Sequence, residues 1–205
     1  MPSQKTKPGF IQPMLLLRTE RLPEGPNWLY ELKLDGYRAI GIKSAGSVHL
    51  RSRNNKSFDG KYPAIVQALT RLPDETVLDG EVVALDESGR PSFNAPQNSS
   101  STAHLCYYVF DVLVLAGRNV VSEPLSTRRE LLRRQVLPRL TDPIREAPKF
   151  DASLGDLIGA VREQGLEGIV AKQLDSACEP GQRAGKPAAA ARRRSFRGIP
   201  LRDPA

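Results

Sequence analysis

One lysine, Lys33, stands between two carboxylates, Glu31 and Asp35, in the segment 28–38. Charged and apolar residues alternate here, which is the period-two pattern of a half-buried β-strand. Gly36 follows and allows the backbone to turn or to approach a ligand closely. A lysine placed in this way at a strand end can act as a covalent nucleophile. Because Lys-x-Asp-Gly sequences also occur in ordinary surface turns, this interpretation depends on the other motifs of the chain.

Other polar side chains lie in or beside apolar, strand-like segments. Asp79 and Glu81 share one face of the segment 76–85, where a buried carboxylate needs a partner such as a divalent metal, a ribose hydroxyl or an arginine. A salt bridge at the edge of a strand is the alternative. Arg53 lies on the charged face of the second strand of an expected hairpin. Phe110, by pattern alone, is a core residue of the most apolar strand.

Five short motifs occur in order along the chain. They are Glu31-Leu32-Lys33-Leu34-Asp35-Gly36-Tyr37-Arg38, Ser52-Arg53-Asn54, Leu78-Asp79-Gly80-Glu81, Tyr108-Val109-Phe110-Asp111 and Glu167-Gly168-Ile169-Val170-Ala171-Lys172. With these motifs the sequence resembles the adenylation domain of ATP-dependent DNA ligases, in particular the bacterial end-joining type. The resemblance extends over residues 10–183 and includes the opening segment 10–15.

The resemblance implies a reaction and the residues that carry it. Lys33 would attack the α-phosphorus of ATP and form a lysyl-AMP phosphoramidate, from which AMP passes to a DNA 5′-phosphate before the 3′-hydroxyl closes the nick. Phe110 would stack on the adenine. The residues implied to bind the nucleotide are Glu31, Arg38, Arg53, Glu81, Phe110 and Lys172, and those implied to help bind Mg²⁺ or Mn²⁺ are Glu81 and Glu167. The metal would neutralise phosphate charge and orient the displacement.

The elements that must position these residues are strands with a few helices. The expected fold is α+β, with mainly antiparallel sheets and flanking helices around a nucleotide cleft, as in the ligase adenylation domain. Expected strands are 28–34, 39–43, 48–53, 76–85, 105–115 and 167–172, and expected helices are 63–72, 127–140 and 153–164. Thr127 and Glu130 have the spacing of a capping box, and the arginines that follow the cap are expected to cover a solvated face. Those arginines are Arg128, Arg129, Arg133 and Arg134.

The composition indicates an ordinary globular protein. The chain has 205 residues, of which 40% are hydrophobic and 26% charged, which suits one domain with one good-sized core. We find neither an apolar run long enough to cross a membrane nor a secretory signal, so we expect a cytoplasmic protein. Cys106 and Cys178 have no zinc-like spacing and are expected to be reduced. We further expect a monomer that acts on nicked or broken duplex DNA, with a Ku-like end-joining partner implied by the resemblance.

The two ends of the chain differ from its body. Most of the net charge of +7 lies after residue 180. A ligase would continue after segment 179–183 to a Trp-x-Lys-x-Lys motif and an oligonucleotide-binding barrel, and residues 184–205 contain neither. We therefore expect a disordered arm at 1–9, an adenylation domain at 10–183 and a disordered basic tail at 184–205. The change looks like a truncation or a reading-frame shift, which would weaken the activity.

Two other interpretations of the sequence stay open. Related nucleotidyltransferases, such as RNA ligases and messenger-RNA capping guanylyltransferases, use the same lysine chemistry. The chain could instead be an inactive remnant or a non-enzymatic nucleic-acid binder with a basic tail. In that case no covalent nucleotide would form. Labelling with ATP or with GTP separates a DNA ligase from a capping enzyme.

Overall fold

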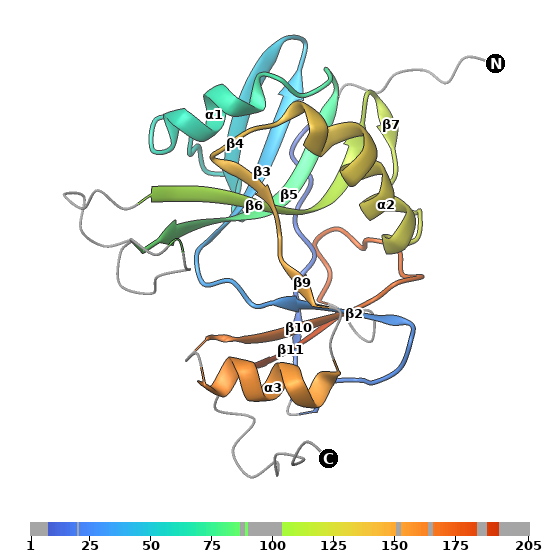
Figure 1. Ribbon diagram of the computed structural model, residues 1–205. Helices are drawn as coiled ribbons and strands as arrows, with labels where there is room; N and C mark the ends of the chain where they lie inside the picture. Colours follow the sequence, from blue (N-terminus) through green and yellow to red (C-terminus); the bar gives the residue numbers. More distant parts are fainter. Residues whose placement is uncertain are drawn as a thin grey trace.

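Two β-sheets, one above the other, and three α-helices make up the described part of the chain (Figure 1). The computed structural model describes residues 8–19, 21–86, 89, 104–150, 153–163, 166–183 and 188–192, the last of these for the backbone alone. Most neighbouring strands are antiparallel. The prediction of an α+β fold with mainly antiparallel sheets and flanking helices is therefore confirmed. No helix in the described residues is both long and apolar enough to cross a membrane.

The larger sheet has the strand order β4-β3-β5-β6-β7, with β8 parallel to β6. Its strands are β3 (Tyr37–Ser44), β4 (Ser47–Ser52), β5 (Thr76–Leu85), β6 (His104–Leu115), β7 (Arg118–Asn119) and β8 (Ile144–Glu146). β5 and β6 are apolar along most of their length because both of their faces are buried. On one face Tyr107 packs with Leu69 of helix α1 (Pro63–Leu69) and with Leu132, which follows helix α2 (Leu125–Leu131).

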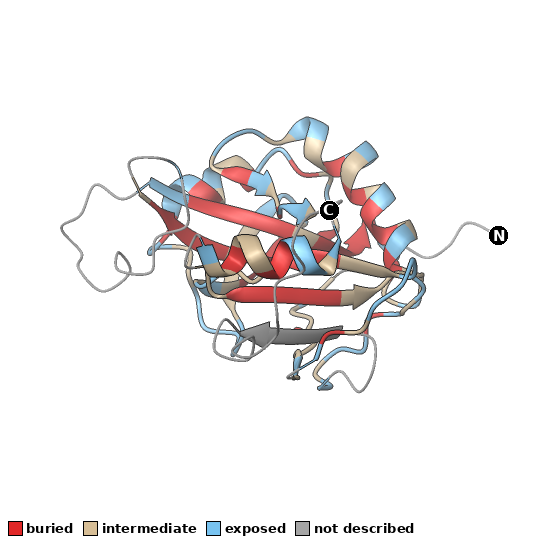
Figure 2. Ribbon diagram, turned by 60° about the horizontal axis from the view of Figure 1, so that its bottom comes forward, coloured by how far each residue is buried: buried red, intermediate tan, exposed pale blue. Residues whose placement is uncertain are grey.

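The smaller sheet has five strands in the order β1-β11-β10-β2-β9. They are β1 (Leu17–Arg18), β2 (Trp28–Leu32), β9 (Lys149–Phe150), β10 (Gly168–Gln173) and β11 (Ala188–Arg192). Helix α3 (Leu154–Glu163) covers its outer face, where Leu157 and Val161 pack with Tyr30 and Ile169. Figure 2 shows the resulting pattern, with buried residues along the strands and on the inner sides of the helices.

The helix expected at 127–140 differs from the prediction in where it begins and in the type of its last turns. It begins at Leu125, continues from Leu132 as a π-helical turn and ends in a 3₁₀ turn. The capping box is therefore wrong, since no side chain caps this helix. The first backbone N–H groups, those of Leu125 and Ser126, instead donate to the carbonyls of Ser176 and Leu174, at 2.9 and 2.8 Å. A neighbouring loop thus satisfies donors that a cap would otherwise bind.

The prediction that four arginines cover a solvated face is wrong for two of them. Arg128 and Arg129 are buried, with 2% and 5% of their surface exposed. The side chains of Arg133 and Arg134 are 38% and 78% exposed. The prediction failed for the first pair because buried carboxylates on β2 and β6 supply partners that allow a guanidinium to leave water.

The prediction of a disordered tail differs from the structure over one segment. Residues Ala188–Arg192 form β11, which pairs antiparallel with β10 and parallel with β1. Ladder hydrogen bonds use backbone groups, so a segment without alternating apolar side chains can still pair with the edge of β10. The other residues expected in the tail, and residues 1–7 of the expected arm, lie outside the described part of the chain.

Candidate active site

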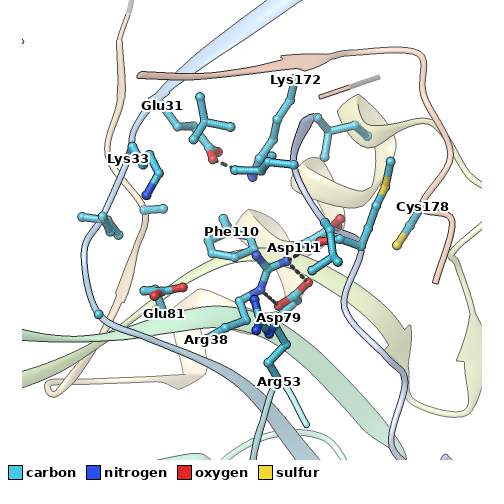
Figure 3. Close-up of a pocket in the computed structure, with 18 of the residues that line it drawn as sticks. Glu31, Lys33, Arg38, Arg53, Asp79, Glu81, Phe110, Asp111, Lys172 and Cys178 are labelled. Atoms are coloured by element: carbon cyan, nitrogen blue, oxygen red, sulfur yellow. Dashed lines mark hydrogen bonds and ion pairs between the residues drawn. The ribbon is translucent and has the colours of Figure 1, made fainter. Parts of the chain in front are cut away.

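A cleft of about 520 Å³ lies between the two sheets, a size in the range of small-molecule sites. Its lining comes from all five motifs singled out in the sequence, and the candidate site residues among it are Glu31, Lys33, Arg38, Arg53, Glu81, Phe110 and Lys172. Figure 3 shows these side chains converging on the cleft from strands of both sheets. Glu167, the remaining candidate, contacts Lys33 directly. Residues that are far apart in the sequence are thus brought together as expected.

Lys33 directly follows the last residue of β2. Its backbone N–H donates to the carbonyl of Gly168 at 2.9 Å, which fixes the chain against β10. Its Nζ donates to Glu167 Oε1 at 2.5 Å, with both side chains largely shielded from solvent. The flanking carboxylate Glu31 has other partners. The ionic partner of Lys33 is therefore Glu167, which lies 134 residues further along the chain.

Gly36 allows the connection from β2 to β3 to run close to β5. A Cβ at this position would collide with the backbone carbonyl oxygen of Val82. From the sequence, Gly36 was expected to allow either a turn or a close approach to a ligand. In the structure it allows a close approach to the backbone of β5. Any larger residue would displace the loop that leads from Lys33 to Arg38.

Glu31 is buried and paired with two cations. Lys172 Nζ lies 2.6 Å from its Oε2, and Arg129 Nη1 donates to its Oε1. A buried carboxylate needs such partners. Its contacts in the structure are therefore with protein groups on β10 and α2.

Phe110 projects into the cleft from a break in the ladder between β5 and β6. Asp79 pairs with Asp111 and Gly80 pairs with Val109, so Phe110 is the extra residue of a β-bulge. Bulges redirect a side chain, and here the ring lies under two cations (Figure 3). Lys172 Nζ is 4.2 Å and Arg38 Cζ is 4.6 Å from the ring centroid. The interpretation of Phe110 as a core residue is thus correct only in part, because the residue packs against a core cluster but is half-buried at the cleft wall.

Asp79 and Glu81, which share one face of β5, have different environments. Asp79 forms a two-pronged ion pair with Arg38, at 2.6 Å to Nε and 2.7 Å to Nη2. The arginine alternative for this carboxylate is therefore the one observed. Burial raises the pKa of Glu81 to about 7. The cations Arg38 and Lys33 oppose this rise, and the carboxylates of Asp79 and Glu167 add to it.

Arg53 lies at the exposed rim of the cleft, in the turn that follows β4. Its position agrees with the expectation that the charged face of this strand is on the ligand side. Within the described residues, no group of three or more His, Cys, Asp or Glu side chains could hold a metal ion. Carboxylates that face this cleft would therefore need ligand oxygens to complete a metal site.

Two arginines of α2 complete the site and were missed by the sequence interpretation. Arg128 donates from Nε and Nη2 to both carboxylate oxygens of Asp111, at 2.9 and 2.8 Å. Arg129 donates to Glu31, to the carbonyl of Phe110 and to Glu146. The signal in the sequence was the number of carboxylates within apolar strands, since a buried carboxylate needs a partner and an arginine is one candidate.

Comparison with known proteins places this site in a family. The sequence model of the ATP dependent DNA ligase domain matches residues 13–186. The chain belongs to this family. The resemblance inferred from the five motifs is therefore confirmed, and the cleft is the candidate active site of a DNA ligase domain.

Similar proteins include bacterial end-joining enzymes. This ligase domain is 36% identical over 174 residues to the multifunctional non-homologous end joining protein LigD of Pseudomonas aeruginosa, covering 83% of this chain and 21% of LigD. It is 32% identical to the SPbeta prophage-derived DNA ligase-like protein LigB of Bacillus subtilis, and the match covers 85% of this chain and 65% of LigB. The solved structure of a mycobacterial DNA ligase D complexed with ATP and MES is similar to this structure, with a TM-score of 0.72 and 30% sequence identity. The match covers 89% of this chain and 60% of that chain. The chain thus spans about a fifth of the length of LigD.

Proposed function

We propose that this chain catalyses the nucleotidyl-transfer steps of an ATP-dependent DNA ligase, with Lys33 as the nucleophile. The observation that carries the proposal is the position of Lys33 Nζ. It faces a cleft of nucleotide size and contacts Glu167, in a chain that belongs to the ligase family. The amine becomes covalently linked to AMP, and AMP is then passed to a DNA 5′-phosphate.

The first step can be written on the atoms of this site. Lys33 Nζ forms a bond to the α-phosphorus of ATP while the bond from that phosphorus to the bridging oxygen of the β-phosphate breaks, and pyrophosphate leaves. Before attack the ammonium must lose a proton, and Glu167 Oε1, at 2.5 Å, is within reach to accept it. Phe110 offers its ring for stacking with the adenine, and Lys172 and Arg38 lie beside it to bind the phosphates.

A divalent cation fits the carboxylates of this cleft. Burial raises the pKa of Glu81, and the nearby carboxylates of Asp79 and Glu167 add to the rise, so a cation at this position would be favoured. Mg²⁺ and Mn²⁺ bind through one or two carboxylates together with phosphate oxygens, so Glu81 and Glu167 would hold the ion. When bound, the metal supplies charge neutralisation at the phosphates and orients them for in-line displacement.

The proposed substrate is duplex DNA with a nick or a break. Arg53 at the exposed rim is placed to contact a ribose or phosphate, and the similar LigD proteins are named for non-homologous end joining. We extend the proposal to a Ku-like partner because of this similarity, and we also propose a monomeric state and a cytoplasmic location.

Incubation with α-labelled ATP and Mg²⁺, followed by a denaturing gel, tests the proposal. We expect a labelled band with ATP that is absent with GTP, after chelation by EDTA, and in Lys33→Ala. Equal or stronger labelling with GTP would favour a capping-type enzyme. Labelled AMP transferred to nicked RNA but not to nicked DNA would favour an RNA ligase. A folded protein that takes no label would contradict the proposal and favour an inactive remnant or a nucleic-acid binder.

A further inference from the structure

One guanidinium, that of Arg129, connects the two walls of the cleft. Arg129 lies on α2, and its side chain is only 6% exposed. Its Nη1 donates to Glu31 Oε1 on β2, which belongs to the five-stranded sheet. The same Nη1 donates to the carbonyl of Phe110 at 3.2 Å, and Nη2 donates to Glu146 Oε1 at 2.8 Å. β6 and β8, which carry these two acceptors, belong to the six-stranded sheet.

Both ends of this connection lie beside groups that the proposed reaction needs. Glu31 lies on β2, two residues before Lys33, which directly follows that strand, and the other oxygen of Glu31 binds Lys172 at 2.6 Å. The position of Glu31 therefore fixes where the two lysines enter the cleft. Phe110 is the bulge residue of β6, and its carbonyl accepts from Arg129 while its ring faces the cleft.

We propose that Arg129 is a positioning residue, which sets the distance between the nucleophile and the ring of Phe110. This inference rests on the proposed function of Lys33. Arg129 contacts none of the reacting atoms and acts through Glu31 and the Phe110 backbone. A guanidinium suits this task because its planar set of donors holds two or three acceptors at fixed angles, whereas an ammonium is a point charge on a flexible stem. Arg129→Lys therefore keeps the charge and loses the fixed geometry.

Arg133, one helical turn further along in the π-helical turn that follows α2, provides a matched control. Its Nε donates to the same Glu146 oxygen at 2.8 Å, but its side chain is 38% exposed and the structure shows no bond from it to the five-stranded sheet among the described residues. Arg133→Lys thus makes the same chemical change without affecting the link between the sheets.

The first experiment measures self-adenylation in a single turnover at saturating ATP, with Tm recorded for each variant. We expect Arg129→Lys to lower the rate constant by about 10- to 100-fold, the cost of misplacing reacting groups by around 1 Å, while the labelled fraction stays near that of the wild type. Arg133→Lys should stay within about threefold of the wild type. A variant that loses only labelled fraction and Tm, with an unchanged rate constant, would show that Arg129 has a structural role alone.

A second experiment does not depend on adenylation. Spin labels on Gln67→Cys of α1 and Glu163→Cys of α3, both exposed positions, report the separation of the two sheets, and the native Cys106 and Cys178 are buried. We expect Arg129→Lys to shift or broaden the distance distribution, and Arg133→Lys to leave it unchanged. If Arg129→Lys does not fold, Glu146→Gln, which loosens the same link at a partly exposed residue, is measured instead. An unchanged distance distribution in Arg129→Lys would overturn the inference. A wild-type protein that forms no covalent AMP adduct would refute only the proposed function.

Discussion

At the scale of single residues, the site depends on ion pairs between distant parts of the chain. Lys33 was singled out because two carboxylates flank it, yet its partner is Glu167, 134 residues away. Glu31 is instead held by Arg129 and Lys172. Local alternation could predict which residues face the cleft, because a strand fixes their direction. It could not predict their partners, because strand order is decided by packing of the whole chain.

Glu167→Gln tests Glu167 as the proton acceptor proposed for Lys33. The amide keeps an oxygen that can accept a hydrogen bond from Nζ, but it no longer accepts a proton readily. Because Glu167 is also proposed to bind the divalent cation, the rate is measured at saturating Mg²⁺. We expect the single-turnover rate of adenylation to fall by about 10²-fold or more, the range typical for loss of a general base. Glu163→Gln, an exposed change on α3, is the control and should have no effect. A wild-type rate in Glu167→Gln would exclude this role.

At the scale of elements, α2 holds the bulge of β6 in place with buried cations. Arg128 binds Asp111, which follows Phe110, and also donates to the carbonyls of Glu123 and Ser176, at 2.5 and 3.1 Å. The side chain of Arg128 is only 3% exposed. Through Arg128 and Arg129, α2 therefore holds Asp111 and the backbone of Phe110 in place at the cleft wall.

Arg128→Met should destabilise the protein strongly, because it leaves the buried carboxylate of Asp111 without its cation. We expect a loss of about 3–5 kcal/mol in the free energy of unfolding, measured by urea denaturation. Arg134→Met, in the π-helical turn that follows α2, removes an exposed pair with Glu130, and the expected change is below about 1 kcal/mol. Equal effects of the two substitutions would show that the Arg128 pair contributes little.

Sequence patterns predicted some of the strands and helices correctly and others not. β5 was predicted with its observed bounds, since β-branched apolar residues favour a strand that is buried on both faces. The arginines of α2 were placed on the wrong face, because the helical pattern counts charged residues as solvated. β11 was missed since pairing along an edge uses backbone groups that every residue type provides.

At the scale of the whole molecule, the cleft lies between two sheets that have separate cores. The described core residues divide into four clusters, and the two cysteines are buried in different clusters. Burial raises the pKa of Cys106 to about 11 and that of Cys178 to about 12. An unfolded thiol titrates near about 8.5.

These thiols should make stability depend on alkaline pH. The folded state retains the thiol protons at pH values where the unfolded state has lost them, so stability is full below about pH 8.5 and falls as pH rises towards 11. Each thiol should add a slope of up to about 1.4 kcal/mol per pH unit. Urea denaturation from pH 8 to 9.5 measures it, and Cys178→Ala should lower the slope. An identical slope in that variant would contradict the burial of Cys178 in solution.

The location of the covalent nucleotide tests most directly whether Lys33 is the nucleophile. The protein is incubated with ATP and Mg²⁺, digested, and its peptides are analysed by mass spectrometry under conditions that preserve a phosphoramidate. We predict one AMP group per chain, on the peptide that contains Lys33, and none in Lys33→Arg, which keeps the charge but cannot form the intermediate. AMP found on Lys172 or on another residue of folded protein, and retained in Lys33→Arg, would contradict the assignment of Lys33 as the nucleophile.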